Sequence, residues 1–347
     1  MTRIYLIRHA AAEGNLYRVA HGQYNSTITS RGYRQLAWLR KRFEGVKLDA
    51  VYGSDLLRAQ TTASALYIPR GLPFRPMSLL REIRMGAWEQ LSWGEIARQD
   101  AEMYHNFNHR PDLFFVEGAE TCAEVRDRML EAVRRLASEH PDGTIAATSH
   151  GVALRILLGT LEGLSLAQIG ETPYGDNTAV SLLEVEGDDI RLVYRDDASH
   201  VPAGAKVHRR GISADSDGKY TVVATQPGLW YRVLWETDEN IELEAMLGEE
   251  RVGRLALCIE NGVFRITEYT ILPGRRGQYF SVQLLGQAVK YARKHDFDEI
   301  AVTCGEDMIP YFEKHGFALS GKAGAEAEMV MDIRRVIRAI PAPECGE

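Results

Sequence analysis

One short stretch constrains the fold of this chain more than any other, because a mostly apolar run in it stops at two polar, titratable side chains. Residues Arg3–Ile7 form the run, and Arg8 and His9 follow it. A strand buried on both faces reads as nearly continuous hydrophobic residues, and open α/β sheets bind ligands beyond the carboxyl ends of such strands. We therefore expect Arg8 and His9 at the ligand-binding edge of a mostly parallel sheet.

The same arrangement returns near the middle of the chain. Residues 144–148 predict a buried strand, and Ser149, His150 and Gly151 follow it directly, ahead of a helix over 152–158. Because the carboxyl ends of parallel strands meet at one edge of a sheet, the pattern predicts that a second histidine lies near the first.

Two more charged residues interrupt apolar segments of the first half. A strand over 48–52 leads to a helix over 56–67 that contains Arg58, and Glu82 lies within the apolar run 79–83. Alternating strands and helices predict an α/β domain. Its other predicted elements are helices over 30–43 and 121–139 and a closing hairpin of strands over 178–185 and 190–194.

These five residues, Arg8, His9, Arg58, Glu82 and His150, suit phosphoryl transfer. A neutral imidazole can attack phosphorus and become a phosphohistidine, which divides one difficult displacement into two easier ones. Guanidinium groups present forked donors that match phosphate oxygens and stabilise the charge of the group in transfer. A carboxylic acid can protonate the leaving alkoxide and later help to activate water, and Glu82 is the candidate for that role.

The segment over 85–118 is rich in aromatic residues and has no clean periodicity, which favours a lid or cap of short helices and loops. Its aromatic side chains could stack against a substrate or could form a small core of their own. They are Trp88, Trp93, Tyr104, Phe107, Phe114 and Phe115.

The second half of the chain predicts a separate domain. At 347 residues the chain is longer than one hydrophobic core usually supports, and the composition over 196–219 changes to Asp, Ser, Gly and Ala. We expect a first domain over 1–198, a linker over 199–224 and a second domain over 225–347. The second domain is predicted to contain strands over 229–235, 242–247, 251–258, 263–271, 299–304 and 329–333, with helices ending near 295 and 314.

Composition excludes several classes of function. A formal net charge of −7 argues against a nucleic-acid-binding protein. The four cysteines are far apart, which favours neither a zinc site nor a disulfide framework. No run approaches eighteen apolar residues and no tripartite leader precedes Arg3, so we expect a cytoplasmic protein without a membrane partner.

Four motifs of the first half occur in an order that resembles the histidine phosphatase (phosphoglycerate-mutase-like) superfamily over residues 1–198. The first is Leu6–Ala10 with Asn15, although Ala10 stands where glycine is commoner. The other three motifs are Ser54–Ala59 with Thr62 and Ala63, Leu80–Ile83 with Gly86–Glu89, and Ser149–Gly151 with Arg155.

This resemblance implies a three-layer α/β domain with a mostly parallel sheet. It implies that His9 is the phosphorylated nucleophile, that Glu82 is the proton donor, and that Arg8, Arg58 and His150 bind phosphate. It also implies that Asn15, Ser149 and Gly151 contact substrate, and that neither a metal nor another cofactor is required. The segment over 82–89 is similar to the phosphatase branch of the family, which favours hydrolysis of a small phosphorylated metabolite over a mutase reaction.

The second domain resembles a GNAT-type N-acetyltransferase over residues 225–335, which implies a smaller α+β fold. Residues 273–281 look like that family's coenzyme A loop, with Arg276, Gly277, Gln278 and Ser281 as candidate contacts to acetyl-CoA. Two departures favour a use other than acetyl transfer. Tyr279 stands where the family has glycine, and Phe312 stands where a tyrosine acid is common.

Several alternatives stay open. The second domain could serve dimerisation, ligand sensing or restriction of access to the phosphatase site, and an exposed edge of its sheet could form a homodimer. The chain could instead be a sensor or scaffold for a phosphorylated ligand and an acyl-CoA, or a bifunctional phosphatase and N-acetyltransferase. The residues do not identify the leaving group of the substrate.

Overall fold

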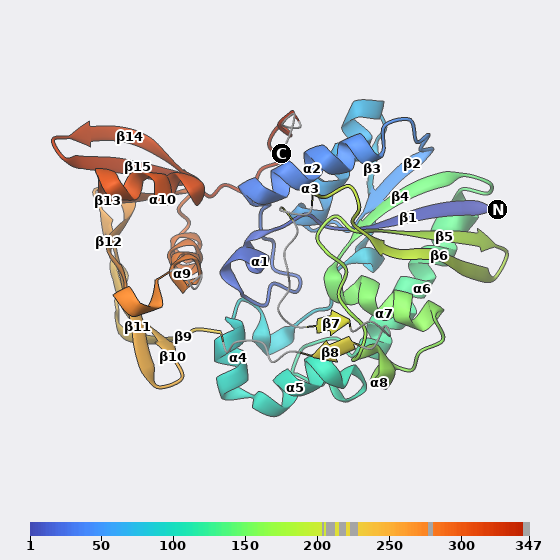
Figure 1. The fold of residues 1–347 in the computed structure, drawn as a ribbon, viewed down its shortest axis with the longest axis horizontal. Coiled ribbons are helices and arrows are strands. Elements are labelled where there is room, and N and C mark those ends of the chain that lie inside the picture. The colour runs from blue at the N-terminus through green and yellow to red at the C-terminus, as the bar shows by residue number, and fades with distance from the viewer. Residues whose placement is uncertain (203–204, 206–211, 215–219, 223–227, 277–279, 343–347) are drawn as a thin grey trace.

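The computed structural model describes residues 1–202, 205, 212–214, 220–222, 228–276 and 280–342. Two large sheets lie at opposite ends of the molecule, one formed by the first half of the chain and one by the second (Figure 1). A short hairpin of β7 (Ile212–Ala214) and β8 (Tyr220–Val222) stands between them in sequence, within the predicted linker.

The first sheet has six strands in the order β3-β2-β4-β1-β5-β6. The first four strands run parallel to one another, β5 runs antiparallel to β1, and β6 runs antiparallel to β5. Arg8 pairs with Ser149 at the end of the β1–β4 ladder, so the residues that follow the two strands leave the same edge of the sheet. The strands are β1 (Thr2–Arg8), β2 (Ala50–Gly53), β3 (Phe74–Pro76), β4 (Thr144–Ser149), β5 (Val180–Glu186) and β6 (Asp189–Asp197).

Helices cover both faces of this sheet because successive side chains of a strand point to opposite faces. Ile4 and Leu6 of β1 lie in one hydrophobic core with α6 and α7, whereas Ile7 lies in another with α2 and α3. The predicted three-layer α/β architecture is confirmed. The helices are α1 (Glu13–Tyr17), α2 (Ser30–Arg42), α3 (Leu57–Tyr67), α4 (Trp93–Gln99), α5 (Ala101–His109), α6 (Cys122–Glu139), α7 (Gly151–Leu161) and α8 (Leu166–Ile169).

The aromatic segment over 85–118 forms short helices, α4 and α5, as expected, and most of its aromatic side chains belong to the core. Trp88 and Phe114 are buried against each other with ring centroids 5.5 Å apart. Trp93 and Tyr104 pack on the same core and also line a cleft, whereas Phe115 is 73% exposed.

The second sheet has seven strands in the order β14-β15-β13-β12-β11-β10-β9. The parallel pair β12 and β13 meets over two registered pairs only, Arg265 with Ala301 and Ile266 with Val302. Helix α9 packs on this sheet and supplies much of the second core. The elements are β9 (Trp230–Glu236), β10 (Asn240–Leu247), β11 (Glu250–Glu260), β12 (Val263–Ile271), α9 (Phe280–Lys294), β13 (Glu299–Gly305), α10 (Ile309–Lys314), β14 (Phe317–Ala323) and β15 (Glu326–Asp332).

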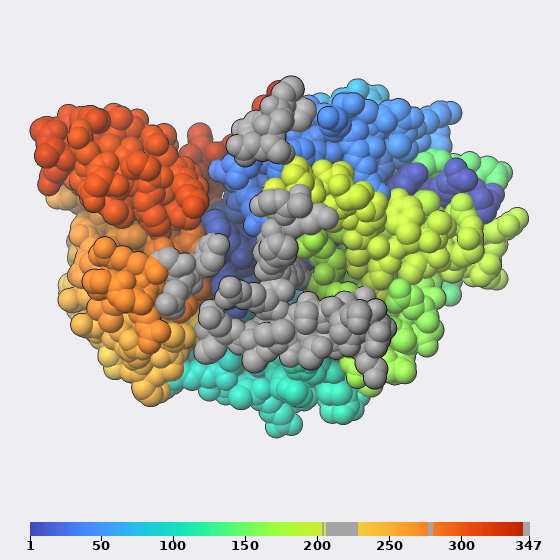
Figure 2. Space-filling view, in the orientation of Figure 1, coloured from blue at the N-terminus to red at the C-terminus, as the bar shows by residue number. Residues whose placement is uncertain are grey.

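The second half therefore forms a sheet-rich domain of its own, and β14 is an edge strand that the sequence pattern did not predict. Figure 2 shows the second domain, orange to red, beside the first, with dark-blue N-terminal residues visible where the two meet. Within the described part of the chain, no helix combines the length and apolar character that crossing a bilayer requires.

Candidate active site

The two histidines that follow β1 and β4 lie next to each other. The amide of His9 donates to the carbonyl oxygen of Ser149 over 2.9 Å, which ties the two strand ends together. The imidazole rings of His9 and His150 have centroids 5.2 Å apart. Both side chains are buried, with exposures of 1% and 0%.

A backbone contact defines the tautomer of His9. Its Nδ1 lies 2.8 Å from the carbonyl oxygen of Ala10, so Nδ1 carries the proton and donates it, because a carbonyl can only accept. Burial holds the pKa of His9 well below its usual value, and the charges of Arg58 and Arg8 lower it further. At neutral pH the ring is therefore uncharged, with its lone pair on Nε2, which is the form that attacks phosphorus.

Arg58 comes from the first turn of α3 and is fully buried. Its Nη1 donates to the carbonyl of Tyr24 over 2.8 Å, its Nη2 to that of Gly22 over 2.6 Å, and its Nε to Nδ1 of His150 over 3.2 Å. Burial lowers the pKa of Arg58 to about 10, so the guanidinium remains charged at neutral pH.

His150 is oriented by this contact. Because its Nδ1 accepts from Arg58, its proton sits on Nε2, which is buried and finds no hydrogen-bond partner among the described residues. Burial first, and then the charge of Arg58, hold the pKa of His150 well below its ordinary value. A neutral Nε2–H group beside His9 is a donor suited to a phosphate oxygen.

Glu82 is held by the start of α7. Its carboxylate accepts from the backbone amides of Val152 at 3.1 Å and Ala153 at 2.9 Å, and it is 7% exposed. Its own carbonyl oxygen accepts from Arg128 over 3.2 Å. The carboxyl group is thereby fixed near the strand ends and lines the same cleft as Arg8.

Arg8 lies against the first residue of α7. Its guanidinium donates to the carbonyl of Gly175, and a Cβ added at Gly151 would lie 3.3 Å from three atoms of that guanidinium. Gly151 therefore leaves room for the arginine, since a larger residue would crowd it. Both residues line the cleft.

Asn15 lines the cleft, as the predicted contact requires, and it has a partner that the sequence did not indicate. The Asn15 side-chain oxygen accepts from Nδ2 of Asn177 over 3.3 Å, and the same Nδ2 donates to the carbonyl of His9 over 2.9 Å. The predicted contact of Ser149 with substrate stays a prediction, and its hydroxyl donates to the carbonyl of Leu80 over 2.8 Å. Ser149 thus fastens the strand end to the segment that carries Glu82.

His21 is a third imidazole at the site, and the sequence pattern did not single it out. Its ring lies 5.7 Å from that of His9, edge to face, and its Nδ1 contacts Oγ of Ser26 at 3.1 Å. Gly14 makes room for it, because a Cβ there would come within 2.3 Å of the ring. Burial, then Arg58 and Arg8, hold the pKa of His21 well below its usual value.

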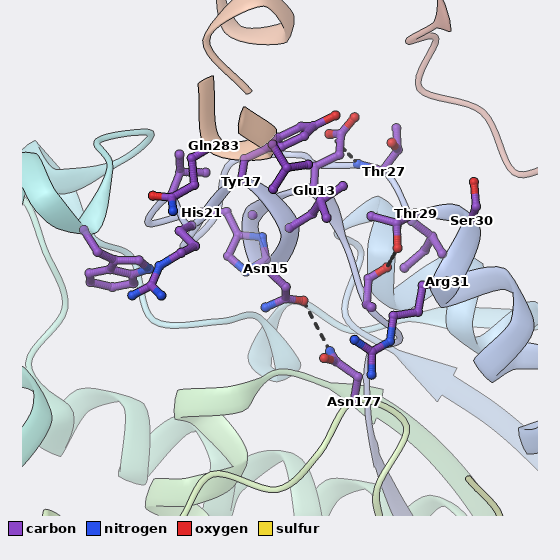
Figure 3. A pocket seen from close by; sticks show the side chains of 18 of the residues that line it. Glu13, Asn15, Tyr17, His21, Thr27, Thr29, Ser30, Arg31, Asn177 and Gln283 are labelled. Carbon is purple, nitrogen blue, oxygen red and sulfur yellow. Dashed lines mark hydrogen bonds between the residues drawn. The ribbon is translucent and has the colours of Figure 1, made fainter. Parts of the chain in front are cut away.

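The cleft has a volume of about 2950 Å³, and residues of both domains line it. Arg8, His21 and Glu82 line it from the first domain, whereas His9, Arg58 and His150 are buried and are not among its lining residues (Figure 3 shows part of its wall). Arg276 and Ser281 face it from the second domain, and the other two candidate coenzyme A contacts, Gly277 and Gln278, lie outside the described residues. No group of three or more potential metal ligands occurs among the side chains described.

The first domain is an α/β fold whose strand ends bring His9 and His150 together, and comparison with known proteins identifies its family. The model of the histidine phosphatase superfamily (branch 1) matches residues 4–198, and the chain belongs to that superfamily.

Individual relatives cover the same half of the chain. Phosphoserine phosphatase 1 of Hydrogenobacter thermophilus is 25% identical over 187 residues, which are 54% of this chain and 88% of that protein. A Cronobacter sakazakii protein named "Probable phosphoglycerate mutase GpmB" is 30% identical over 165 residues, 47% of this chain and 76% of its own length. The solved structure of Bacillus stearothermophilus YhfR is 32% identical with a TM-score of 0.56, covering 58% of this chain and 99% of that one.

Proposed function

We propose that the first domain is a metal-independent phosphomonoesterase that works through a phosphohistidine at His9 and acts on a small phosphorylated metabolite. The observation that carries this proposal is the uncharged ring of His9. Its Nδ1–H donates a hydrogen bond to the carbonyl of Ala10, so the lone pair lies on Nε2, and the charges of Arg58 and Arg8 act on the ring. Membership of the superfamily and relatives named as phosphatases support it.

The reaction has two displacements. In the first, Nε2 of His9 forms a bond to phosphorus while the bond from phosphorus to the ester oxygen breaks, and Glu82 gives that oxygen a proton. In the second, Glu82 takes a proton from water, the water oxygen bonds to phosphorus, and the bond from phosphorus to Nε2 breaks to release phosphate. Arg8, Arg58 and the Nε2–H of His150 stabilise the charge on the phosphoryl oxygens in both steps.

The test is phosphate release from a panel of phosphomonoesters, with His9→Ala as the inactive variant and a labelled phosphoenzyme trapped by rapid quenching. Wild type is expected to release phosphate and retain acid-labile label, whereas His9→Ala does neither. Equal turnover by the two proteins would refute the role of His9.

Hydrolysis and mutase chemistry share the first displacement and differ in the acceptor. Because one relative is named as a probable phosphoglycerate mutase, mutase chemistry is the alternative to hydrolysis. Transfer of the label to a second hydroxyl compound rather than to water would identify the mutase.

We propose in addition that the second domain is a GNAT-type fold without acetyl transfer. The parallel strands β12 and β13 that pair only at Ile266 and Arg265, beneath helix α9, support this topology. Phe312 is 2% exposed and carries no ionisable group, and the hydroxyl of Tyr311 shares a hydrogen bond with that of Tyr269. Both observations support a use other than acetyl transfer. Calorimetry with acetyl-CoA and an amine panel tests this, since acetylation would show the bifunctional alternative and binding of the thioester without turnover would favour a sensor.

A further inference from the structure

Helix α1 follows the nucleophile by three residues and has two faces. Glu13 and Tyr17, one turn apart, point toward helix α9 of the second domain, whereas Asn15 points the other way, toward Asn177 (Figure 3). Since Asn177 also holds the carbonyl of His9, one short helix contacts both the catalytic loop and the second domain.

A forked ion pair joins the two domains at this helix. The Nη1 of Arg293 donates to one carboxylate oxygen of Glu13 over 2.7 Å, and Nη2 donates to the other over 2.8 Å. The side chains are 9% and 10% exposed, so water screens the pair little. Glu13 also accepts from the amide of Thr27 over 3.0 Å, which fastens the loop after α1 to the same carboxylate.

The same guanidinium reaches a residue that orients Arg58. Nη1 of Arg293 donates to the hydroxyl of Tyr24 over 3.0 Å, and the carbonyl of Tyr24 accepts from Arg58 over 2.8 Å. A continuous path of contacts therefore runs from α9 of the second domain to the arginine beside His150.

Helices α1 and α9 are also in close apolar contact. Tyr17 is 6% exposed and belongs to the hydrophobic core of the second domain. A Cβ added at Gly286 of α9 would lie 2.5 Å from Cβ of Tyr17, so the glycine is what lets the two helices meet at this distance.

We propose that Arg293 is a positioning residue for phosphoryl transfer: by holding Glu13 and Tyr24, the second domain keeps α1 and the loop over 22–27 in the arrangement that orients Asn15 and Arg58. The proposal rests on the phosphatase function proposed above. It gives the second domain a role in the reaction of the first without requiring any chemistry of its own.

The test uses the full chain and the hydrolysis of para-nitrophenyl phosphate. Arg293→Met is expected to lower kcat/KM by about 10- to 100-fold, the range that follows from a misplaced binding group. Arg293→Lys, which keeps the charge but loses the fork, should recover part of the loss. Lys294→Gln is the matched control, because the next residue of α9 is exposed and its ion pair with Glu236 stays within the second domain.

Arg293→Met leaves Glu13 unpaired and could unfold the chain, so the double variant Glu13→Gln with Arg293→Met keeps the test decisive. A neutral pair of similar shape is tolerated in buried sites, and the double variant should fold, as circular dichroism reports, while kcat/KM stays low. Wild-type kcat/KM in a folded double variant would overturn the proposal.

Failure of the phosphatase function has a different signature. If wild type hydrolyses no phosphomonoester, the proposed function fails, and the positioning role is then tested by titration with orthovanadate. A dissociation constant raised at least tenfold in the double variant but not in Lys294→Gln would support positioning, and equal constants in all three proteins would overturn it.

Discussion

Arg58 donates from Nε to Nδ1 of His150 across 3.2 Å, and this contact decides which nitrogen of the histidine carries the proton. The Nε2–H that results faces no protein partner among the described residues. In the proposed reaction, the guanidinium of Arg58 and the Nε2–H of His150 are both donors to the phosphate. The same guanidinium also donates to the carbonyls of Gly22 and Tyr24, so Arg58 helps to fix the loop that contains these two residues.

Arg58→Lys is expected to lower kcat/KM for any phosphomonoester by about 100-fold, the typical cost of removing a donor to a developing oxyanion. Lysine keeps the charge but cannot donate to Gly22, Tyr24 and His150 from one planar group. Steady-state kinetics with para-nitrophenyl phosphate measures the effect. Unchanged kcat/KM would show that charge alone is sufficient at this position.

Glu82→Gln should discriminate between leaving groups. A general acid contributes roughly 10²- to 10⁴-fold when the departing alkoxide is basic, and little when the departing phenolate is stable without a proton. We expect kcat for an alkyl phosphate to fall within that range while kcat for para-nitrophenyl phosphate falls far less. Equal losses for the two substrates would contradict the role of Glu82 as proton donor and favour a role in binding.

The stability of the protein should fall as the pH drops below the ordinary pKa of histidine. The pKa values of His9, His21 and His150 lie well below that value in the folded chain, so the unfolded chain takes up protons first and is favoured in acid. Each such histidine costs about 1.4 kcal/mol of unfolding free energy between roughly pH 7.5 and pH 5.5.

His21→Gln removes one of these groups and should reduce that loss by about 1.4 kcal/mol. Urea denaturation at both pH values measures the difference. A His21→Gln curve parallel to that of wild type would mean that His21 is not held neutral in the folded chain.

Gly286→Ala should destabilise the protein even though alanine favours a helix interior by about 1 kcal/mol over glycine. The added methyl group would meet Cβ and Cγ of Tyr17 at 2.5 and 2.6 Å, which forces α9 away from α1. Thermal unfolding measures the change against Gly321→Ala, where a Cβ meets nothing within 4 Å. A rise in Tm for Gly286→Ala would show that the contact between α1 and α9 can accommodate the added methyl group.

The sequence predicted the residues that follow buried strands better than the loops that face them. His9 and His150 could be read from apolar runs that stop at a histidine, and the register of β1 with β4 places them together. His21 had no such signal, because it follows no strand and its nearness to His9 depends on the path of a loop.

The periodicity of the sequence likewise could not predict the contacts between the domains. A five-residue helix such as α1 is too short to show an apolar stripe, and the partner of Glu13 lies 280 residues away. Strand β14 was missed for a related reason, since it is an edge strand and most of its side chains are exposed, which removes the alternation that reveals a half-buried strand.

Tyr17 is supplied by one half of the molecule and packs inside the other. The two halves are consequently not interchangeable modules, even though each has its own sheet. A recombinant that joined the first domain to an unrelated second domain would leave Tyr17 without the packing it has against Gly286, and this second domain, joined to another partner, would lose the side chain that fills the space at Gly286.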